Sequence, residues 1–226
     1  MKKEIFGFEY DKKYEYENGF YLTSQLSRVS KLITHWELYK KIVNIPGEVL
    51  EFGVYKGASL IRFSTFREML ESQYSRKVIG FDSFGEFPLT QSTEDNEFIE
   101  KFINAGGNGI SKEELEYALK EKGIFNFELV AGDILKTLPE YLEKNPELRI
   151  SLLHIDVDVY EVTKEILELL FDRVEKDGVI ILDDYNSVSG ATIAINEFFE
   201  NKKVETGIEY KIEKLPYYSV PSFVVK

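Results

Sequence analysis

The sequence contains no cysteine, and only two of its 226 residues are histidine. Disulfide bonds, cysteine nucleophiles and thiolate metal sites are therefore excluded. A bound metal ion would have to use oxygen ligands, or His35 and His154. Positive charge is also scarce, because 28 lysine and arginine residues stand against 40 acidic ones and give a net charge of -12. This balance argues against nucleic acid or an anionic membrane as the partner and favours a small molecule.

Long hydrophobic runs are missing as well. No apolar stretch approaches the ~20 residues that cross a membrane, and the N-terminal stretch carries charges throughout, unlike a signal peptide. We therefore expect a cytoplasmic protein. Hydrophobic residues make up 43% of the chain and aromatic residues 14%, which suffices for a large core. The length suits one α/β domain, so we expect residues 1–226 to form a single domain, and a homo-oligomer remains open.

Strand-like runs alternate with helical patterns along most of the chain. Expected strands begin near Val49, Val78, Phe127, Ile150 and Gly178, and expected helices near Ala58, Ile134, Glu161 and Ala191. Runs such as ISLLHI and GVIIL lack polar alternation, which indicates strands buried on both faces of a parallel sheet. The C-terminal stretches GIEYKIEKLP and YYSVPSFVVK alternate like an antiparallel pair. We predict an α/β, doubly wound, Rossmann-like fold with a mostly parallel seven-stranded sheet and an antiparallel C-terminal edge.

Two further segments surround this repeat. Residues 1–46 form an N-terminal helical segment, in which an amphipathic helix is expected from Thr23 to about Asn44, with Thr23 or Ser24 as its cap. Residues 85–126 are interpreted as an insertion over the site, with a short helix in KEELEYALKEKG. No tandem repeat or low-complexity tract is visible.

The first candidate site is the turn after the strand near Val49, which reads Glu51-x-Gly53-x-x-x-Gly57. A dinucleotide-binding turn would have three glycines as G-x-G-x-x-G and would meet a pyrophosphate at the helix start. An acidic residue before the turn repels phosphate and suits an ammonium group. The motif therefore favours a ligand with an amino-acid head, such as S-adenosylmethionine, over NAD, although a tight turn without any ligand is the plainer alternative.

Asp82 ends the next expected strand, where a carboxylate can accept hydrogen bonds from both hydroxyls of a ribose. Its alternative role is to cap the turn that follows. Asp133 ends the third strand and is a weaker candidate of the same kind, because it stands where the helix near Ile134 needs an N-cap.

Four aspartates form the most specific pattern: Asp156 and Asp158 follow one strand, and Asp183 and Asp184 follow the next. Neighbouring strand ends would bring them together, and converging carboxylates raise one another's pKa unless a cation offsets the charge. Oxygen ligands of this kind select Mg²⁺, Mn²⁺ or Ca²⁺. The alternative is helix capping. We interpret His154 as a hydrogen-bonded core residue and His35 as a packing or surface residue.

The segments E-F-G-V-Y-K-G-A-S, G-F-D-S-F-G-E-F-P, H-I-D-V-D-V-Y and L-D-D-Y together resemble the macrocin O-methyltransferase family. The resemblance spans about Val49 to Glu200. It implies the class I methyltransferase version of the fold, and methylation of a sugar hydroxyl, in a glycoside or on a nucleotide-linked 6-deoxyhexose, with S-adenosylmethionine and Mg²⁺. Val157 stands between Asp156 and Asp158 where the family pattern leads us to expect glycine.

The resemblance also implies roles for individual residues. Glu51 and Gly53 would hold the methionine end of the donor, Asp82 its ribose, and Asp133 with its neighbours the adenine. The residues expected to bind the donor are Glu51, Gly53, Gly57, Ser59, Asp82, Ser83, Gly132, Asp133 and Asp156. The metal ligands would be Asp156, Asp183 and Asp184, and Asp158 would be the catalytic base.

This chemistry agrees with the residues. A sulfonium methyl is already activated, so the enzyme mainly aligns the acceptor oxygen behind it, and a metal would help a carboxylate to deprotonate a weakly acidic hydroxyl. Three alternatives stay open: a metal-dependent methyltransferase for catechol-like phenols, an NAD-dependent oxidoreductase, and a non-catalytic module that binds S-adenosylmethionine or a sugar.

Overall fold

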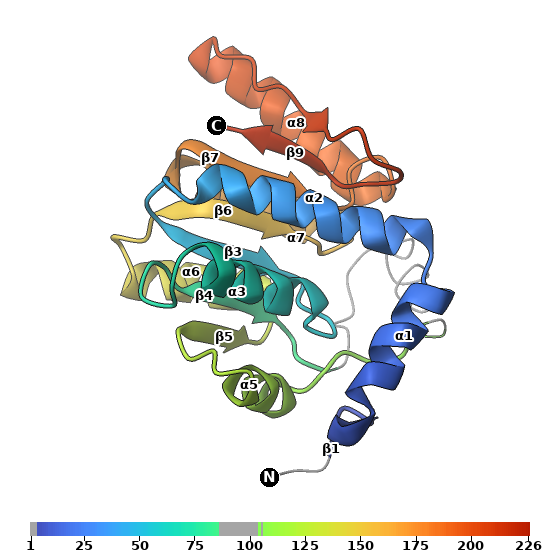
Figure 1. Cartoon of the computed structure of the whole chain (residues 1–226). Helices are drawn as coiled ribbons and strands as arrows, with labels where there is room; N and C mark the ends of the chain where they lie inside the picture. The colour runs from blue at the N-terminus through green and yellow to red at the C-terminus, as the bar shows by residue number, and fades with distance from the viewer. Residues whose placement is uncertain (1–3, 86–103, 105) are drawn as a thin grey trace.

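The computed structural model describes residues 4–85, 104 and 106–226, and its centre is a seven-stranded sheet (Figure 1). The strands are β3 (Glu48–Phe52), β4 (Val78–Asp82), β5 (Phe127–Ala131), β6 (Ile150–Ile155), β7 (Val174–Leu182), β8 (Glu213–Lys214) and β9 (Ser222–Val225). Their order is β5-β4-β3-β6-β7-β9-β8. The first five are parallel, and β9 runs antiparallel to both β7 and β8. The predicted fold class is confirmed.

Helices cover both faces of this sheet (Figure 1). The helices are α2 (Leu26–Ile42), α3 (Ala58–Leu70) and α5 (Lys112–Glu121) on one face, and α6 (Ile134–Lys144), α7 (Tyr160–Leu170) and α8 (Ser189–Thr206) on the other. Successive strand residues point to opposite faces, so Val49 packs with Leu38 and Leu60 in one core and Leu50 joins the core on the other face. This is why the central strands are mainly apolar on both faces.

The N-terminal segment differs in detail from the prediction. A short hairpin of β1 (Glu4–Ile5) and β2 (Phe8–Glu9) and a turn of 3-10 helix, η1 (Tyr10–Lys12), precede α1 (Lys13–Thr23). Neither Thr23 nor Ser24 caps the predicted helix, because α1 extends to Thr23 and α2 begins only after Gln25. No residue of α1 is buried, so the helix carries no apolar stripe from which it could be predicted. Figure 1 places α1 beyond the carboxyl ends of the parallel strands.

Part of the predicted insertion at 85–126 lies outside the described residues, namely 86–103 and 105. The helix expected in KEELEYALKEKG is α5. The side chain of Ser111 caps it by accepting a hydrogen bond from the backbone N–H of Glu114 at 3.3 Å. α5 is part of the connection between the parallel strands β4 and β5, and it packs Leu115 and Leu119 into the core. Among the described residues, no helix combines the length and apolar character needed to cross a bilayer.

Candidate active site at the carboxyl edge of the sheet

Backbone hydrogen bonds align the ends of the parallel strands at one edge. The N–H of Asp156 donates to the carbonyl of Phe52 at 2.9 Å, and the N–H of Asp183 donates to that of Ile155 at 3.0 Å. On the other side of β3, the N–H of Gly53 donates to the carbonyl of Phe81 at 3.0 Å. The chain reverses its direction across the sheet between β3 and β6, and such switch points are where open α/β sheets bind ligands. The sequence-predicted site residues gather around this point.

The glycine turn has a packing reason as well as a functional one. Gly53 has φ of +85°, and a Cβ there would meet the backbone oxygen of Asp156 at 1.7 Å. Gly57 has φ of +79° at the N-cap of α3, where a Cβ would meet Leu115 at 2.6 Å. Gly53 therefore lets the end of β3 approach the backbone after β6, and Gly57 lets the start of α3 approach α5, whether or not a ligand is bound.

Glu51 is fully buried on the face of β3 that α2 and α3 cover. Its Oε1 accepts a hydrogen bond from the hydroxyl of Ser59, and Oε1 also lies 3.3 Å from Nδ1 of His154. The second oxygen, Oε2, is buried without a hydrogen-bond partner. A buried carboxylate oxygen without a donor is costly, so Glu51 fits a cationic donor such as an ammonium group.

Asp82 ties the glycine turn to the end of β4. Its Oδ2 accepts hydrogen bonds from the N–H groups of Val54 at 2.7 Å and Tyr55 at 3.0 Å. Its Oδ1 accepts from the N–H of Phe84 at 2.7 Å and lies 3.4 Å from the hydroxyl of Ser83. Asp82 therefore holds the loop that would surround a ligand, and its contact with a ribose stays a prediction.

Asp133 caps a helix, which the sequence had offered as the alternative to ligand binding. It is the N-cap of α6, and its Oδ1 accepts a hydrogen bond from the N–H of Leu135 at 3.1 Å. The preceding Gly132, with φ of +136°, donates its N–H to the carbonyl of Asp82 at 3.0 Å. Gly132 and Asp133 therefore lie beside Asp82, and their contact with adenine stays a prediction.

The four aspartates meet, but in two groups. Oxygens of Asp156, Asp158 and Asp184 lie within 4.8 Å of one another, and the N–H of Asp158 donates to Oδ2 of Asp184 at 3.0 Å. Asp183 faces α2 instead: its Oδ2 is 2.7 Å from the ammonium of Lys31, and its Oδ1 is 3.5 Å from Nε2 of His154. Of the predicted metal ligands, Asp156 and Asp184 therefore converge directly, and Asp183 adjoins them.

The electrostatics of this group are those of crowded, buried carboxylates. Burial, with the neighbouring charge of Asp183, raises the pKa of Asp156 to about 7. Burial also raises the pKa of Asp158 and, well beyond its usual range, that of Asp184. Burial acts in the same direction on Asp183, but Lys31 and His154 outweigh it and hold the pKa of Asp183 well below its usual range. A cation near the other three carboxylates would relieve their repulsion.

Lys31 is the site residue that sequence reasoning missed. It projects from α2 and lies 3.2 Å from Oδ2 of Asp156 and 2.7 Å from Oδ2 of Asp183, with 18% of its side chain exposed. A signal was present, because Lys31 stands one helical turn before His35 and two before Leu38, on the buried face. A lysine on the core-facing stripe of a helix indicates a buried acidic partner.

The two histidines, His35 and His154, are both fully buried. The prediction of a core position holds for His154, which lies between Glu51 and Asp183 at ion-pair distances but without hydrogen-bond geometry. Burial alone would lower the pKa of His154, but Asp183 and Glu51 outweigh it and raise that pKa to about 9. His35 packs in the core, with its ring 4.9 Å from that of Phe63 and 5.1 Å from that of His154.

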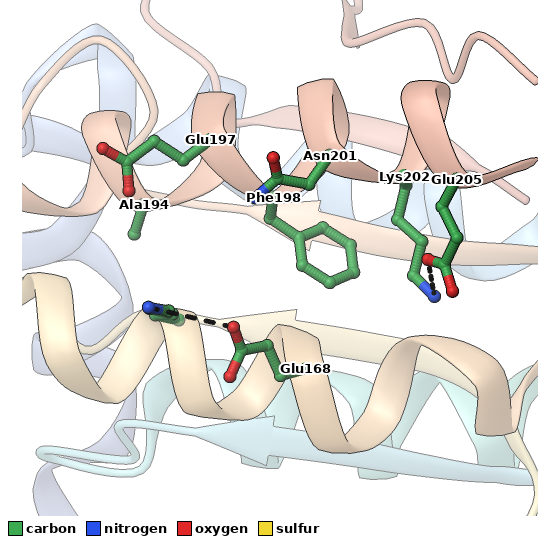
Figure 2. Close-up of a pocket in the computed structure, with 8 residues that line it drawn as sticks. Glu168, Ala194, Glu197, Phe198, Asn201, Lys202 and Glu205 are labelled. Atoms are coloured by element: carbon green, nitrogen blue, oxygen red, sulfur yellow. Dashed lines mark ion pairs between the residues drawn. The ribbon is translucent and has the colours of Figure 1, made fainter. Parts of the chain in front are cut away.

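A groove between α7 and α8 is separate from this edge (Figure 2). It is lined by Lys164, Glu168, Ala194, Glu197, Phe198, Asn201, Lys202 and Glu205. Its charged side chains pair with one another, as in Lys202 with Glu205 at 3.2 Å. None of the predicted site residues lines it, so we do not assign it to the active site.

The strand order, the antiparallel β9 and the site at the β3 and β6 ends define a class I methyltransferase-type α/β fold. Comparison with known families agrees: residues 27–218 match the model described as Macrocin-O-methyltransferase (TylF). The chain belongs to this family. The resemblance inferred from the four sequence segments is thereby confirmed.

Two curated relatives are O-methyltransferases. The chain is 27% identical over 161 residues to the 8-demethyl-8-(2,3-dimethoxy-alpha-L-rhamnosyl)-tetracenomycin-C 4'-O-methyltransferase of Streptomyces olivaceus, covering 68% of this chain and 58% of that one. It is 26% identical over 162 residues to the mycinamicin III 3''-O-methyltransferase of Micromonospora griseorubida, covering 68% and 61%. The match therefore spans about three-fifths of each relative.

Among solved structures, the apo form of CalS11, a TDP-rhamnose 3'-O-methyltransferase of calicheamicin biosynthesis, superposes with a TM-score of 0.67. The two are 25% identical, and the superposition covers 94% of this chain and 86% of that one. The structure of the O-methyltransferase NovP gives a TM-score of 0.70 at 20% identity, covering 86% and 78%. These likenesses support the fold assignment.

Proposed function

We propose that this protein is an S-adenosylmethionine-dependent O-methyltransferase that acts on a sugar hydroxyl of a glycoside or of a nucleotide-linked deoxysugar. The observation that carries the proposal is the family match over residues 27–218, which includes every predicted site residue. The activities of the relatives from Streptomyces olivaceus and Micromonospora griseorubida, and of CalS11, support a sugar acceptor.

The methyl donor would lie along the ends of β3, β4 and β5. Glu51, with its unpartnered Oε2, would accept from the ammonium of the methionine end, beside the turn that Gly53 opens. Asp82 would hold the ribose, and Gly132 with Asp133 would flank the adenine. The aspartates that follow β6 and β7 adjoin this region on the other side of β3, where they would act on the acceptor hydroxyl.

A divalent cation fits these aspartates. Asp156, Asp183 and Asp184 would hold it, because clustered carboxylate oxygens are the ligands that Mg²⁺ and Mn²⁺ prefer. The raised pKa values of Asp156 and Asp184 have the same implication, because both carboxylates lack sufficient positive charge nearby. When bound, such a cation would supply Lewis acidity that makes an acceptor hydroxyl easier to deprotonate.

Asp158 is the proposed base. Its φ of +64° lies in the left-handed region, which costs free energy for a non-glycine residue and often marks a functional position. The backbone there is fixed by the hydrogen bond from the N–H of Asp158 to Asp184. Burial raises its pKa, which brings the carboxylate closer to the range in which a base is effective near neutral pH.

A calorimetric titration with S-adenosylhomocysteine in Mg²⁺ buffer, with NAD as the comparison ligand, tests the donor assignment. We expect micromolar binding of S-adenosylhomocysteine and none of NAD; the reverse result would contradict the proposal. The acceptor is tested by methyl transfer to nucleotide-linked deoxysugars and to catechols as a parallel series. Turnover of catechols alone would replace the sugar acceptor by a phenol.

The metal assignment has its own test. We expect Asp156→Ala and Asp183→Ala to abolish Mg²⁺-dependent methyl transfer while most affinity for S-adenosylhomocysteine is kept. Glu200→Ala, at an exposed position on α8, is the matched control. Full activity in both site variants would remove the metal from the proposal and leave the methyltransferase assignment in place.

A further inference from the structure

Lys31 reaches the proposed metal site from α2, a helix far from the aspartates in sequence. Its ammonium contacts Oδ2 of Asp156 at 3.2 Å and Oδ2 of Asp183 at 2.7 Å. Its place is set by packing, since Thr34, His35 and Leu38 on the following turns of α2 are all fully buried. Packing of α2 thus fixes the backbone of Lys31 beside the site, while its side chain stays free to move.

The oxygens that Lys31 contacts are the ones that a divalent cation needs. Oδ1 of Asp183 points toward Nε2 of His154, at 3.5 Å, in the interior. Asp156, Asp158 and Asp184 have oxygens within 4.8 Å of one another, and Asp183 does not belong to this group. Oδ2 is therefore the atom through which Asp183 can join these three without turning away from His154. That atom is the closer of the two contacts of Lys31.

We infer that Lys31 is a tethered competitor of the divalent cation: its ammonium holds Oδ2 of Asp156 and Asp183, and the cation binds these oxygens only by displacing it. The inference rests on the proposed metal site. The lysine side chain is flexible, so its ammonium can move away from the carboxylates when a divalent cation binds them. Lys31 would keep the aspartates close together and set the affinity for the metal below what the carboxylates alone would give.

The direction of this effect distinguishes a competitor from a supporting residue. If Lys31 only oriented the carboxylates, its removal would weaken metal binding. If it competes, its removal strengthens metal binding, because the cation no longer displaces an ammonium and meets less electrostatic repulsion. We expect the Kd for Mg²⁺ to fall at least tenfold in Lys31→Met.

The experiment is a calorimetric titration of Mg²⁺ into the full chain and its Lys31→Met, Lys31→Gln and Lys31→Arg variants. Lys31→Arg keeps the charge and should bind Mg²⁺ as the unaltered protein does. Lys40→Met is the matched control, because Lys40 lies on α2, is exposed, and contacts Glu37 and the ring of Trp36 rather than the aspartates. It should leave the Kd unchanged.

Thermal unfolding gives a second readout that does not depend on activity. Loss of a counter-ion should lower the Tm of Lys31→Met without metal, and Mg²⁺ should raise that Tm by more than it raises the Tm of the unaltered protein. A packing role would lower the Tm but leave the Mg²⁺ increment unchanged. Lys31→Gln decides the matter if Lys31→Met fails to fold.

Two results would overturn the inference. Equal or weaker Mg²⁺ binding by folded Lys31→Met and Lys31→Gln would show that Lys31 does not compete, and would leave the metal assignment intact. No Mg²⁺ or Mn²⁺ binding by any of the proteins, with S-adenosylhomocysteine still bound, would remove both the competitor and the metal but not the methyltransferase.

Discussion

Asp82 and Val54 are joined across neighbouring strands by a hydrogen bond of 2.7 Å, in which the N–H of Val54 donates to Oδ2 of Asp82. Val54 lies in the glycine turn after β3, and Asp82 is the last residue of β4. The same carboxylate accepts from the N–H groups of Tyr55 and Phe84. One side chain therefore fixes the two loops between which the proposed donor would lie.

These hydrogen bonds predict that Asp82, which we propose to bind the ribose, also stabilises the fold. In Asp82→Asn one oxygen becomes an NH₂ group, which cannot accept the hydrogen bonds on its side. We expect a loss of about 1–3 kcal/mol in the free energy of unfolding, measured by urea titration without ligand. Asp133→Asn is the matched control, since asparagine caps a helix as well as aspartate does. A carboxylate that served only the ribose would leave unfolding of Asp82→Asn unchanged.

Asp158 offers a pair of substitutions that separates chemistry from backbone strain. Asparagine tolerates the left-handed φ of +64°, whereas alanine there costs roughly 1–2 kcal/mol. We expect Asp158→Asn to lower kcat by about 10²–10⁴-fold with the affinities for Mg²⁺ and S-adenosylhomocysteine retained. Asp158→Ala should lose kcat and also stability. An unchanged kcat in Asp158→Asn would reject Asp158 as the base.

The pKa of Asp156 predicts how metal binding depends on pH. That pKa is raised from 3.8 to about 7, so below pH 7 the carboxylate is mostly protonated and cannot bind a metal. We expect the Kd for Mg²⁺ to rise about tenfold between pH 8 and pH 6. An equal Kd at both values would contradict the shift.

The same shift acts on stability. Because the folded pKa of Asp156 exceeds its unfolded value, its contribution is fully present below pH 3.8 and is lost as pH rises through about 7. The Tm without metal should therefore fall between pH 6 and pH 8, and the gain on adding Mg²⁺ should grow. Thermal unfolding at both pH values, with and without Mg²⁺, checks this.

At the opposite edge of the sheet, Arg76 predicts an effect on stability alone. Its buried guanidinium donates to Glu71 and Ser151 and to the carbonyls that end α2, among them Ile42 at 3.2 Å. We expect Arg76→Met to lower the free energy of unfolding by about 3–5 kcal/mol, because Glu71 then stays buried without its cation. Affinity for S-adenosylhomocysteine in the folded protein should not change.

Arg149→Met is the comparison for this prediction. Arg149 is exposed and lies 3.6 Å from Glu175, so its loss should cost no more than about 1 kcal/mol. Equal effects of the two substitutions would show that the network around Arg76 contributes no more than a surface ion pair.

The sequence by itself determined the fold class and the order of the site residues along the chain. Buried parallel strands need mainly apolar runs without polar alternation, such as ISLLHI, and their carboxyl ends need polar residues where the chain emerges from the core. Glu51, Asp82, Asp156 and Asp183 could therefore be placed at one edge from local pattern alone. By contrast, α1 has no buried side, so no periodicity revealed it.

Only the tertiary structure decided what each carboxylate contacts. Asp183 turns to Lys31, 152 residues away in the chain, and Asp82 holds Val54 and Tyr55. Such contacts depend on how α2 packs on the sheet and on which rotamer each buried side chain adopts, and neither is encoded in the spacing of nearby residues. The local sequence thus places charges at a sheet edge, and packing between distant segments decides which of them are neutralised.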